Sequence, residues 1–317
     1  MALNRTWLDA HVKSAYIPIL VDNIFTGVPL LTKLMSKNKV MLDSGQNIRV
    51  PILYGMKKGD AFSGLDRFDI NPVKTRQSAQ WDWKSFYTNV TIIGEEVMKI
   101  EGTEKIIPLV ENEIKEAEMK MKDMLGGVDI GVLGDGTGSS SKAIDGLNIA
   151  ISASAYGDIT PSDLGSNSTN KIWESTVDAT GGAVTLSKIK GYMGGCTYGT
   201  ECPDLGITTQ DVYDSLWGQL QPSQRFLNPA SALAKIGFKG IEIDGMQILV
   251  DRHVPTGYFY GVNTDYFKFI VNKHRNFSWT EDKPLVDADA YVRQLLVACN
   301  LICTSRRYHF KATGLTA

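Results

Sequence analysis

Alternating hydrophobic and polar residues predict two strands within the first hundred residues. Ile48, Val50 and Ile52 recur with a period of two, which is typical of a half-buried strand. Trp81 and Trp83 repeat this alternation further along the chain. Between the two strands lie a polar, Gly-rich stretch and about 20 residues without a helical pattern, an excursion that is uncommon inside a compact domain. We therefore expect an extended segment that packs on another surface.

A long amphipathic helix is predicted next. Thr103 is the predicted N-cap, with Glu104 in the first turn. Apolar residues then recur in steps of three and four, which places one apolar stripe along a helix of about six or seven turns. The stripe is shorter than about four heptads, so packing on a sheet is favoured over a coiled coil. It consists of Ile107, Val110, Ile114, Ala117, Met121, Met124 and Val128.

The second half of the chain mixes short strands and helices. Its polar, Ser- and Thr-rich stretch from about residue 151 to Thr180 is predicted as a long surface loop. The nearly continuous apolar run Tyr291–Cys303 suits a long buried strand. The other predicted elements are a strand at Ile144–Ile151, a helix at Thr185–Met193, a strand at Asp204–Thr208, a helix at Gln210–Gln219 and a hairpin at Gly240–Val250 turned at Asp244-Gly245.

The overall charge argues against a protein that grips nucleic acid. The 317 residues hold 33 Lys and Arg against 35 Asp and Glu, a formal charge of −2, so there is no basic surplus to neutralise phosphates. Four cysteines are too sparse for a disulfide framework and indicate reduced thiols. No apolar run approaches the roughly 18 residues that a membrane span needs.

Near neutrality hides a local asymmetry of charge. Residues 123–170 contain six Asp and a single Lys, Lys142. Residues 290–317 contain no acidic residue and four basic ones, Arg293, Arg306, Arg307 and Lys311. We expect the acidic and the basic segment to pair, within or between chains.

No motif predicts a catalytic, cofactor-binding or metal-binding residue. Gly134–Gly138 is glycine-rich but lacks the Lys-Ser/Thr of a phosphate-binding loop, so a turn is favoured. Asp287 and Asp289 resemble the paired carboxylates of metal-dependent transferases, although solvated carboxylates are the favoured interpretation. Trp81 and Trp83 could stack on nucleic-acid bases, but cross-strand packing is favoured because clustered arginines are missing.

The order of these elements resembles the major capsid proteins of tailed bacteriophages, which have the Hong Kong 97 phage capsid fold. The resemblance covers nearly the whole chain, and no single motif is diagnostic. In the first half it is carried by Val21–Phe25, Pro29–Leu31, Gly45–Pro51, Trp81–Lys84, the helix from Thr103, Leu133–Gly138 and Asp145–Leu147. In the second half it is carried by Pro203–Thr208, Tyr213, Pro222, Arg225-Phe226, Asp251–Tyr260, Asn263–Asp265, Asn300-Leu301 and Arg306-Arg307.

The resemblance implies an α+β fold with an N-terminal arm, an extended E-loop, a peripheral domain with a long spine helix, and an axial domain. Because the arm begins almost at Met1, no cleaved prodomain is expected. The apolar strip Ile17–Val21 and the Trp81/Trp83 face are expected to be buried only on assembly. The implied divisions are residues 1–42 for the arm, 43–92 for the E-loop, 93–198 for the peripheral domain with its spine helix at about 103–130, 199–290 for the axial domain, and 291–317 for the closing strand of the peripheral domain.

The function implied by the resemblance is structural and not enzymatic. It is that of a major capsid, or head, protein that assembles through pentamers and hexamers into an icosahedral shell enclosing phage double-stranded DNA. The protein would be assembled in the host cytoplasm and would reside in the virion. The implied partners are further copies of the chain, a separate scaffolding protein, a portal protein and decoration proteins. DNA would be enclosed without sequence-specific binding, and no membrane would be involved.

Two other functions stay open on the residues alone. The same resemblance fits the shell of an encapsulin-type nanocompartment, which encloses enzyme cargo. A function of a different class, that of a soluble metal-dependent transferase, would use Asp287 and Asp289.

Overall fold

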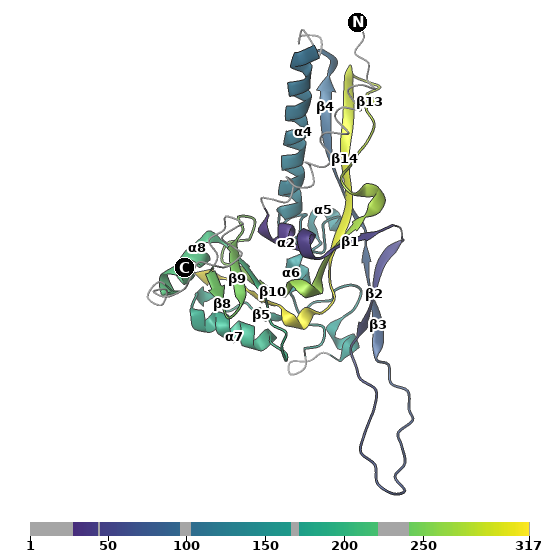
Figure 1. The fold of residues 1–317 in the computed structure, drawn as a ribbon, viewed down its shortest axis with the longest axis vertical. Coiled ribbons are helices and arrows are strands. Elements are labelled where there is room, and N and C mark those ends of the chain that lie inside the picture. The colour runs from purple at the N-terminus through teal and green to yellow at the C-terminus, as the bar shows by residue number, and fades with distance from the viewer. Residues whose placement is uncertain (1–27, 44, 96–102, 166–170, 221–240, 317) are drawn as a thin grey trace.

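A single 14-residue strand, β14 (Ala290–Cys303), organises the structure and is paired along both edges (Figure 1). The computed structural model describes residues 28–43, 45–95, 103–165, 171–220 and 241–316, with the backbone alone for 103–112. On one edge, β14 pairs antiparallel with β4 (Lys84–Ile93). Along the other edge it meets β13 (Lys283–Pro284), β12 (Ser278–Trp279) and β11 (Phe267–Asn272), and β1 (Lys39–Leu42) joins β11 in parallel.

The long buried strand predicted at the end of the chain is thus confirmed. Every residue from Val297 to Cys303 is buried. A strand covered on both faces has no solvent side to favour polar residues, which is why the run is apolar without alternation.

The long helix α4 (Thr103–Gly126) packs on β4, as predicted from its apolar stripe. Ile114, Ala117 and Met121 are all buried. The helix ends at Gly126, earlier than the predicted end near residue 130. Two consecutive glycines stand there, and glycine is a weak helix former. The side chain of Thr103, the predicted cap, lies outside the described residues.

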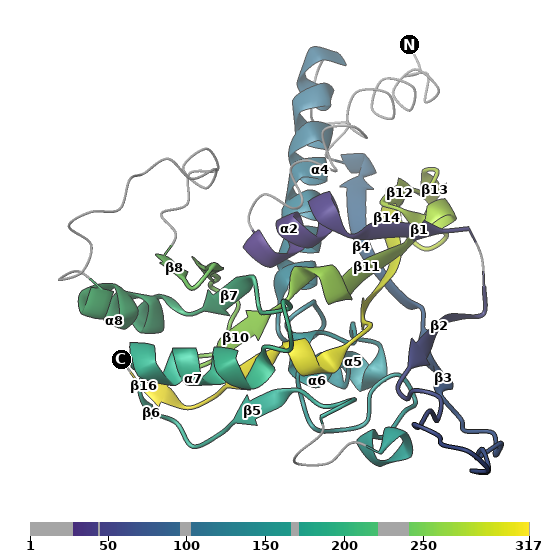
Figure 2. The ribbon, with the colours of Figure 1, turned by 60° about the horizontal axis from the view of Figure 1, so that its bottom comes forward.

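A second sheet has its own apolar core (Figure 2). The helices α7 (Leu186–Cys196) and α8 (Gln210–Leu220) bury Ile189, Val212 and Leu216 in this core. Both views place these helices on the side of the molecule away from β2 and β3. The strands follow the order β5 (Thr176–Asp178), β15 (Phe310–Ala312), β10 (Phe259–Val262), β7 (Leu205–Thr208), β9 (Met246–Val250) and β8 (Ile241–Ile243).

The predictions for this part of the chain are confirmed. Both helices, the strand before α8, and the hairpin of β8 and β9 lie where the patterns placed them. Asp244 and Gly245 have φ angles of 48° and 86°, the two positive values that a tight hairpin turn requires. Two further strands, β6 (Gly182–Ala183) and β16 (Leu315–Thr316), pair in parallel near the C-terminus.

The predicted strand at Ile144–Ile151 is wrong, because this segment contains the short helix α6 (Leu147–Ala150). Ile144, Leu147 and Ile151 are fully buried, at helical spacings of three and four. The Leu147 N–H donates to the Val132 carbonyl and the Ile151 N–H to the Leu147 carbonyl. The backbone N–H groups of this segment thus find acceptors in the segment after α4 and within α6, and need no neighbouring strand.

The predicted long surface loop that follows is only partly right. It contains the 3-10 helix η1 (Pro161–Leu164) and the strand β5, and residues 166–170 lie outside the described residues. Trp173 in this polar stretch is 1% exposed, and its indole N–H donates to the Tyr156 carbonyl at 3.1 Å. A buried aromatic anchor therefore holds the stretch against the core.

The guanidinium of Arg306 is the reason this irregular stretch is ordered. Arg306 is fully buried, and its nitrogens donate to five backbone carbonyls at 2.6–3.1 Å and to the Ser152 hydroxyl at 2.9 Å. Its charged carbon also lies over the rings of Tyr156 and Trp173, at 5.3 and 5.9 Å from their centroids. Burial lowers the pKa of Arg306, and the surrounding carbonyl dipoles offset that cost. The carbonyls belong to Ile149, Ala150, Ser152, Ser154 and Trp173.

The acidic and basic segments do meet within the chain, but mostly through neutral acceptors. Arg306 contacts the acidic segment through carbonyl oxygens, and Lys311 Nζ donates to the carbonyl and side-chain oxygens of Asn148 at 3.0 and 2.8 Å. Two of the aspartates are engaged locally: Asp135 accepts from Thr137 and Asp163 accepts from Thr160. These hydrogen bonds lower the pKa of both carboxyl groups.

Replacing Arg306 is expected to unfold much of this region. Arg306→Ala removes one donor from each of five buried or partly buried carbonyls, and removing one member of a buried charged network typically costs about 3–5 kcal/mol. Arg306→Lys should fail similarly, because an ammonium lacks the planar fork of five donors. Urea denaturation gives the free energy of unfolding. Arg307→Ala, next along the chain and half-buried, is the control, and an Arg306→Lys protein as stable as the wild type would contradict this assignment.

Candidate interaction surface at the extended loop

Residues 54–75 form an extended loop that projects from the body of the molecule (Figure 1). The loop connects β2 (Asn47–Leu53) and β3 (Arg76–Asp82), which pair antiparallel as a separate two-stranded sheet. Apart from one turn near Leu65 it has no regular secondary structure. The predicted long excursion between two strands is confirmed.

Large apolar side chains are concentrated on this loop. Seven of the fifteen exposed large hydrophobic residues of the described structure lie between positions 53 and 73. Leu65 is 101% exposed, Met56 91% and Ile70 89%. Apolar patches of this kind mark surfaces that bind a partner. The seven are Leu53, Met56, Phe62, Leu65, Phe68, Ile70 and Val73.

The far end of the loop has contacts of its own. The rings of Phe62 and Phe68 meet edge to face with centroids 5.1 Å apart. Lys58 forms an ion pair with Asp69. The Ser63 N–H donates to the Asp66 carboxylate at 2.8 Å, which closes the turn that carries Leu65. These contacts hold the far end of the loop, with its exposed apolar side chains, in one arrangement.

The loop is fixed to the body through Trp81 at the end of β3. Trp81 is 3% exposed and meets Tyr156 edge to face at 5.4 Å. Gly157, at φ +61°, passes so close that a Cβ there would lie 2.7 Å from the Trp81 ring. The prediction that Trp81 is buried only on assembly is therefore wrong. Trp83 is half-buried, and its indole N–H donates to the Gly45 carbonyl at 2.9 Å.

A buried asparagine ties the same region to β14. Asn300 Nδ2 donates to the Asp82 carbonyl at 2.9 Å and to the Asp145 carboxylate at 2.8 Å. Asn300 Oδ1 accepts the Asp145 N–H at 3.1 Å. Burial raises the pKa of Asp145, and Asn300 partly offsets this. One side chain thus joins the loop strand, the segment directly before α6 and the central strand.

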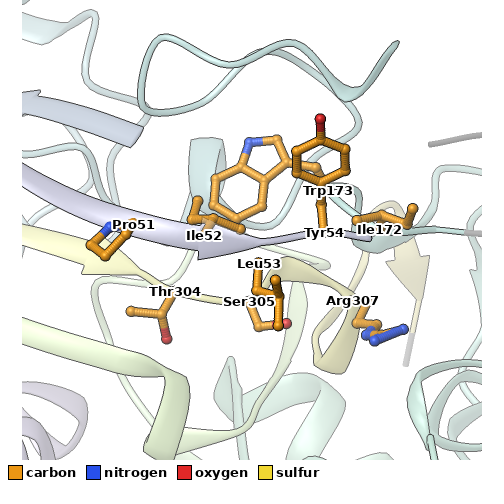
Figure 3. Close-up of a pocket in the computed structure, with 9 residues that line it drawn as sticks. All are labelled: Pro51, Ile52, Leu53, Tyr54, Ile172, Trp173, Thr304, Ser305 and Arg307. Atoms are coloured by element: carbon orange, nitrogen blue, oxygen red, sulfur yellow. The ribbon is translucent and has the colours of Figure 1, made fainter. Parts of the chain in front are cut away.

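A pocket of about 290 Å³ opens beside the start of the loop, and we call it the root pocket (Figure 3). Three segments distant in sequence form it, and one of them is the chain just after β14. Its lining residues are Pro51, Ile52, Leu53, Tyr54, Ile172, Trp173, Thr304, Ser305 and Arg307.

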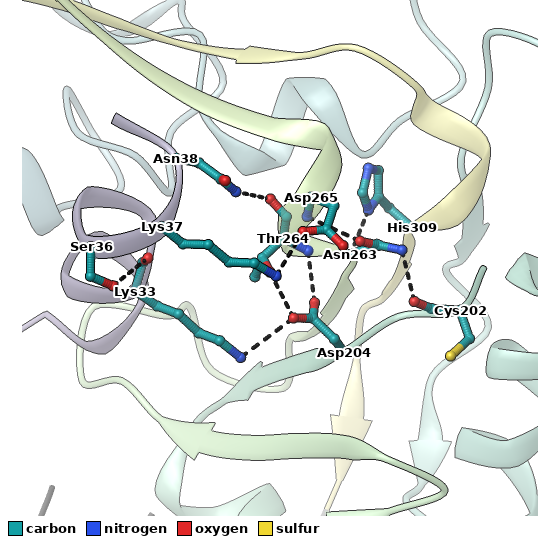
Figure 4. A network of polar contacts seen from close by, with 10 residues as sticks. All are labelled: Lys33, Ser36, Lys37, Asn38, Cys202, Asp204, Asn263, Thr264, Asp265 and His309. Atoms are coloured by element: carbon teal, nitrogen blue, oxygen red, sulfur yellow. Dashed lines mark hydrogen bonds and ion pairs between the residues drawn. The ribbon is translucent and has the colours of Figure 1, made fainter. Parts of the chain in front are cut away.

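A polar network fixes helix α2 (Pro29–Lys37) to the start of β7 (Figure 4). Lys37 Nζ lies 2.7 Å from Asp265 Oδ1, and Lys33 Nζ lies 3.5 Å from Asp204 Oδ2. Asp204 also accepts the N–H and hydroxyl of Thr264 at 2.7 and 2.6 Å. The hydrogen bond to Asp265 raises the pKa of Lys37. Most of the predicted arm, including Ile17–Val21, falls on residues 1–27, outside the described residues.

His309 is buried at the edge of this network as a neutral ring. Its Nδ1 accepts the Asn263 N–H at 3.0 Å, so the ring proton is on Nε2, which lies 3.3 Å from Cys303 Sγ. Burial lowers the pKa of His309 to about 3. A second proton on Nδ1 would break the bond to Asn263.

The residues weighed as candidates for chemistry do not come together. Asp287 and Asp289 lie on the exposed turn between β13 and β14 and line none of the described pockets. Asp135 and Thr137 form a local turn, in line with the turn predicted at Gly134–Gly138. All four cysteines are free. In the described ranges, no three His, Cys, Asp or Glu side chains are placed to hold a metal ion, and no helix is long and apolar enough to cross a membrane.

Solved structures with the same fold are shell proteins. The chain matches a structure of the cyanophage A-1(L) capsid with a TM-score of 0.67 and 14% identity, covering 93% of this chain and 94% of that chain. A match to the capsid of a native GTA particle has a TM-score of 0.60 and 8% identity, covering 90% of each chain. A holo-encapsulin complex from Synechococcus elongatus matches with a TM-score of 0.53 and 11% identity, covering 92% of this chain and 89% of that chain.

No protein-family model and no curated protein sequence matches the chain. The structural matches nonetheless extend over nearly its full length. The protein has the Hong Kong 97 phage capsid fold, and the α+β class predicted from the sequence is confirmed.

Acid is expected to destabilise the fold through His309. Its folded pKa, lowered to about 3, lies below the ordinary value of 6.5, so the unfolded state binds more protons between those two pH values. Stability should therefore fall as the pH drops below about 6.5, by up to about 1.4 kcal/mol per pH unit from this group. His309→Gln keeps an acceptor for Asn263 but does not titrate, so its unfolding free energy should fall less steeply. Urea titrations from pH 7 to pH 4.5 test this, and parallel pH profiles of the two proteins would refute it.

Proposed function

We propose that the chain is a major capsid protein that assembles through pentamers and hexamers into an icosahedral shell around phage double-stranded DNA. The observation that carries this proposal is the extended loop, which projects away from the chain's own core and carries exposed apolar side chains. The fold shared with phage capsid proteins supports it. Within this proposal, residues 1–42 are the arm, 43–92 the E-loop, 93–198 and 291–317 the peripheral domain, and 199–290 the axial domain.

The physical basis of assembly is burial of the loop on a neighbouring copy. Fully burying a side chain such as Leu or Phe contributes about 1.5–3 kcal/mol relative to leaving it exposed. The loop and the surface that receives it are different parts of the subunit, so the contact is heterologous and forms rings where the rotation closes. Six such side chains on the loop, with Leu53 directly before it, supply a driving force for assembly.

The proposed partners follow from the same role. A separate scaffolding protein, a portal protein and decoration proteins would act with the shell, which would be assembled in the host cytoplasm and reside in the virion. The formal charge of −2 supports enclosure of DNA without sequence-specific binding, because a container wall needs no basic groove.

A second candidate is the shell of an encapsulin-type compartment, favoured by the match to the Synechococcus elongatus complex. The two functions differ in what the shell encloses. Purified particles that contain nucleic acid support the capsid, and particles that contain a co-expressed enzyme support the compartment.

Polar replacement of the loop tip is expected to abolish shells without unfolding the subunit. The triple variant Phe62→Ser, Leu65→Ser, Phe68→Ser removes the clustered apolar side chains, all at least 65% exposed. Because these three side chains are exposed, their replacement should leave the urea midpoint of unfolding close to that of the wild type. Electron microscopy and sedimentation velocity should show closed particles for the wild type and free subunits or small oligomers for the variant.

The matched control is Met119→Ser, which removes an exposed apolar side chain, 62% exposed, from helix α4. It should assemble normally. Closed shells in normal yield from the triple variant would show that the loop does not drive assembly, and absence of particles from the wild type under any packaging condition would overturn the function itself.

A further inference from the structure

The root pocket places a few apolar side chains beside polar groups and a cation that has no carboxylate partner among the described residues. Ile52, Leu53 and Ile172 line it, and Leu53 is 66% exposed. Its charged group is Arg307, the half-buried residue that follows the carbonyl-bound Arg306. A ligand for such a pocket needs an apolar side chain next to a negative charge.

Arg307 is held in place by aromatic rings. Its guanidinium carbon lies 5.0 Å from the ring centroid of Tyr198 and 5.4 Å from that of Tyr308. Tyr308 in turn stacks on Tyr266, with centroids 4.5 Å apart. Among the described residues no carboxylate pairs with Arg307. A guanidinium fixed in this way loses little entropy on binding a carboxylate, and Tyr and Arg are the residue types that dominate protein interfaces.

A complementary feature lies on the turn between β13 and β14. Val286 is 98% exposed, Leu285 is 45% exposed, and the adjacent Asp287 is exposed. The Leu285 N–H donates to the Ala290 carbonyl at 3.0 Å, so the turn has a defined shape. No described cation pairs with Asp287. This turn offers the apolar side chain and the carboxylate that a ligand of the root pocket needs.

The two features are at opposite ends of one strand and cannot meet within a chain. The turn directly precedes Ala290, the first residue of β14, and the pocket residues Thr304 and Ser305 directly follow Cys303, its last. At about 3.3 Å per residue, the 14 residues of β14 separate them by roughly 45 Å. Figure 1 shows the turn at one end of the molecule and β2, which lines the pocket, well away from it.

We propose that the root pocket of one copy binds the Leu285–Asp287 turn of a second copy, with the Asp287 carboxylate on the Arg307 guanidinium and Val286 against the side chains of Leu53 and Ile172. The contact rests on the proposed self-assembly and adds a site at the base of the extended loop, separate from the loop tip. Because donor and acceptor differ, the contact is head-to-tail, and β14 sets the spacing between successive copies.

A charge exchange between the two positions tests this contact. Arg307→Glu and Asp287→Arg each place like charges together and should lower the yield of closed particles about tenfold or more, as measured by sedimentation velocity and electron microscopy. The double variant Arg307→Glu, Asp287→Arg restores an opposite pair and should recover most of the wild-type yield. Val286→Asp, at a site 98% exposed and therefore without effect on folding, should impair assembly on its own.

The control for the change of charge is Lys268→Glu on the exposed side of β11, which should assemble normally. The urea midpoint of each purified variant separates assembly defects from unfolding. Normal particles from Arg307→Glu, or a double variant as defective as the single ones, would overturn the contact while wild-type shells still supported the capsid function. A wild-type chain that forms no shells would overturn both.

Discussion

Two-edged pairing of β14 is the constraint on which the rest of the fold depends. One edge carries β4, on which α4 packs, and the other carries β11, to which β1 is added. Asn300 inside this strand fixes the loop strand β3 through the Asp82 carbonyl. Arg306, just beyond its end, gathers the carbonyls of the irregular segment that follows α6. A shift of β14 by one residue would turn Asn300 and the other buried side chains of the strand to the wrong face.

Stability is unevenly distributed around this strand. The start of the extended loop is held by buried groups, chiefly Trp81 against Tyr156 and Gly157. The loop tip is held only by its own contacts, such as Phe62 with Phe68 and the exposed ion pair of Lys58 with Asp69, and exposed ion pairs contribute little. A firmly anchored base with an apolar, self-supporting tip suits a segment that gains its remaining stability from a neighbour.

The sequence predicted those elements that have a distinctive pattern. Helix α4 was predicted from its helical period, the hairpin from its turn residues Asp244-Gly245 and β14 from its nearly continuous apolar run, and all three were found in place. Ile144–Ile151 was predicted wrongly because a short, mostly apolar segment fits a buried helix turn as well as a buried strand. The burial of Trp81, and the positions of Trp173 and Arg306, depend on partners that only the tertiary fold supplies, such as Gly157 and the carbonyl groups around the guanidinium. The root pocket was missed for the same reason, since three distant segments form it.

The distribution of charge acquires a different meaning once the contacts are known. Lys311 and Arg306 from the basic segment, and Asp145 and Asp163 from the acidic one, are engaged inside the chain by carbonyl, amide and hydroxyl groups. The difference in charge between the acidic and the basic segment therefore does not give the molecule one acidic face and one equally basic face. The proposed contacts with other copies use mainly apolar surface, together with Arg307 and Asp287, which have no ion-pair partner among the described residues. On a surface of this kind, the burial of apolar area supplies the affinity between copies. The few charged groups disfavour misaligned contacts, because a charge buried without its partner is costly.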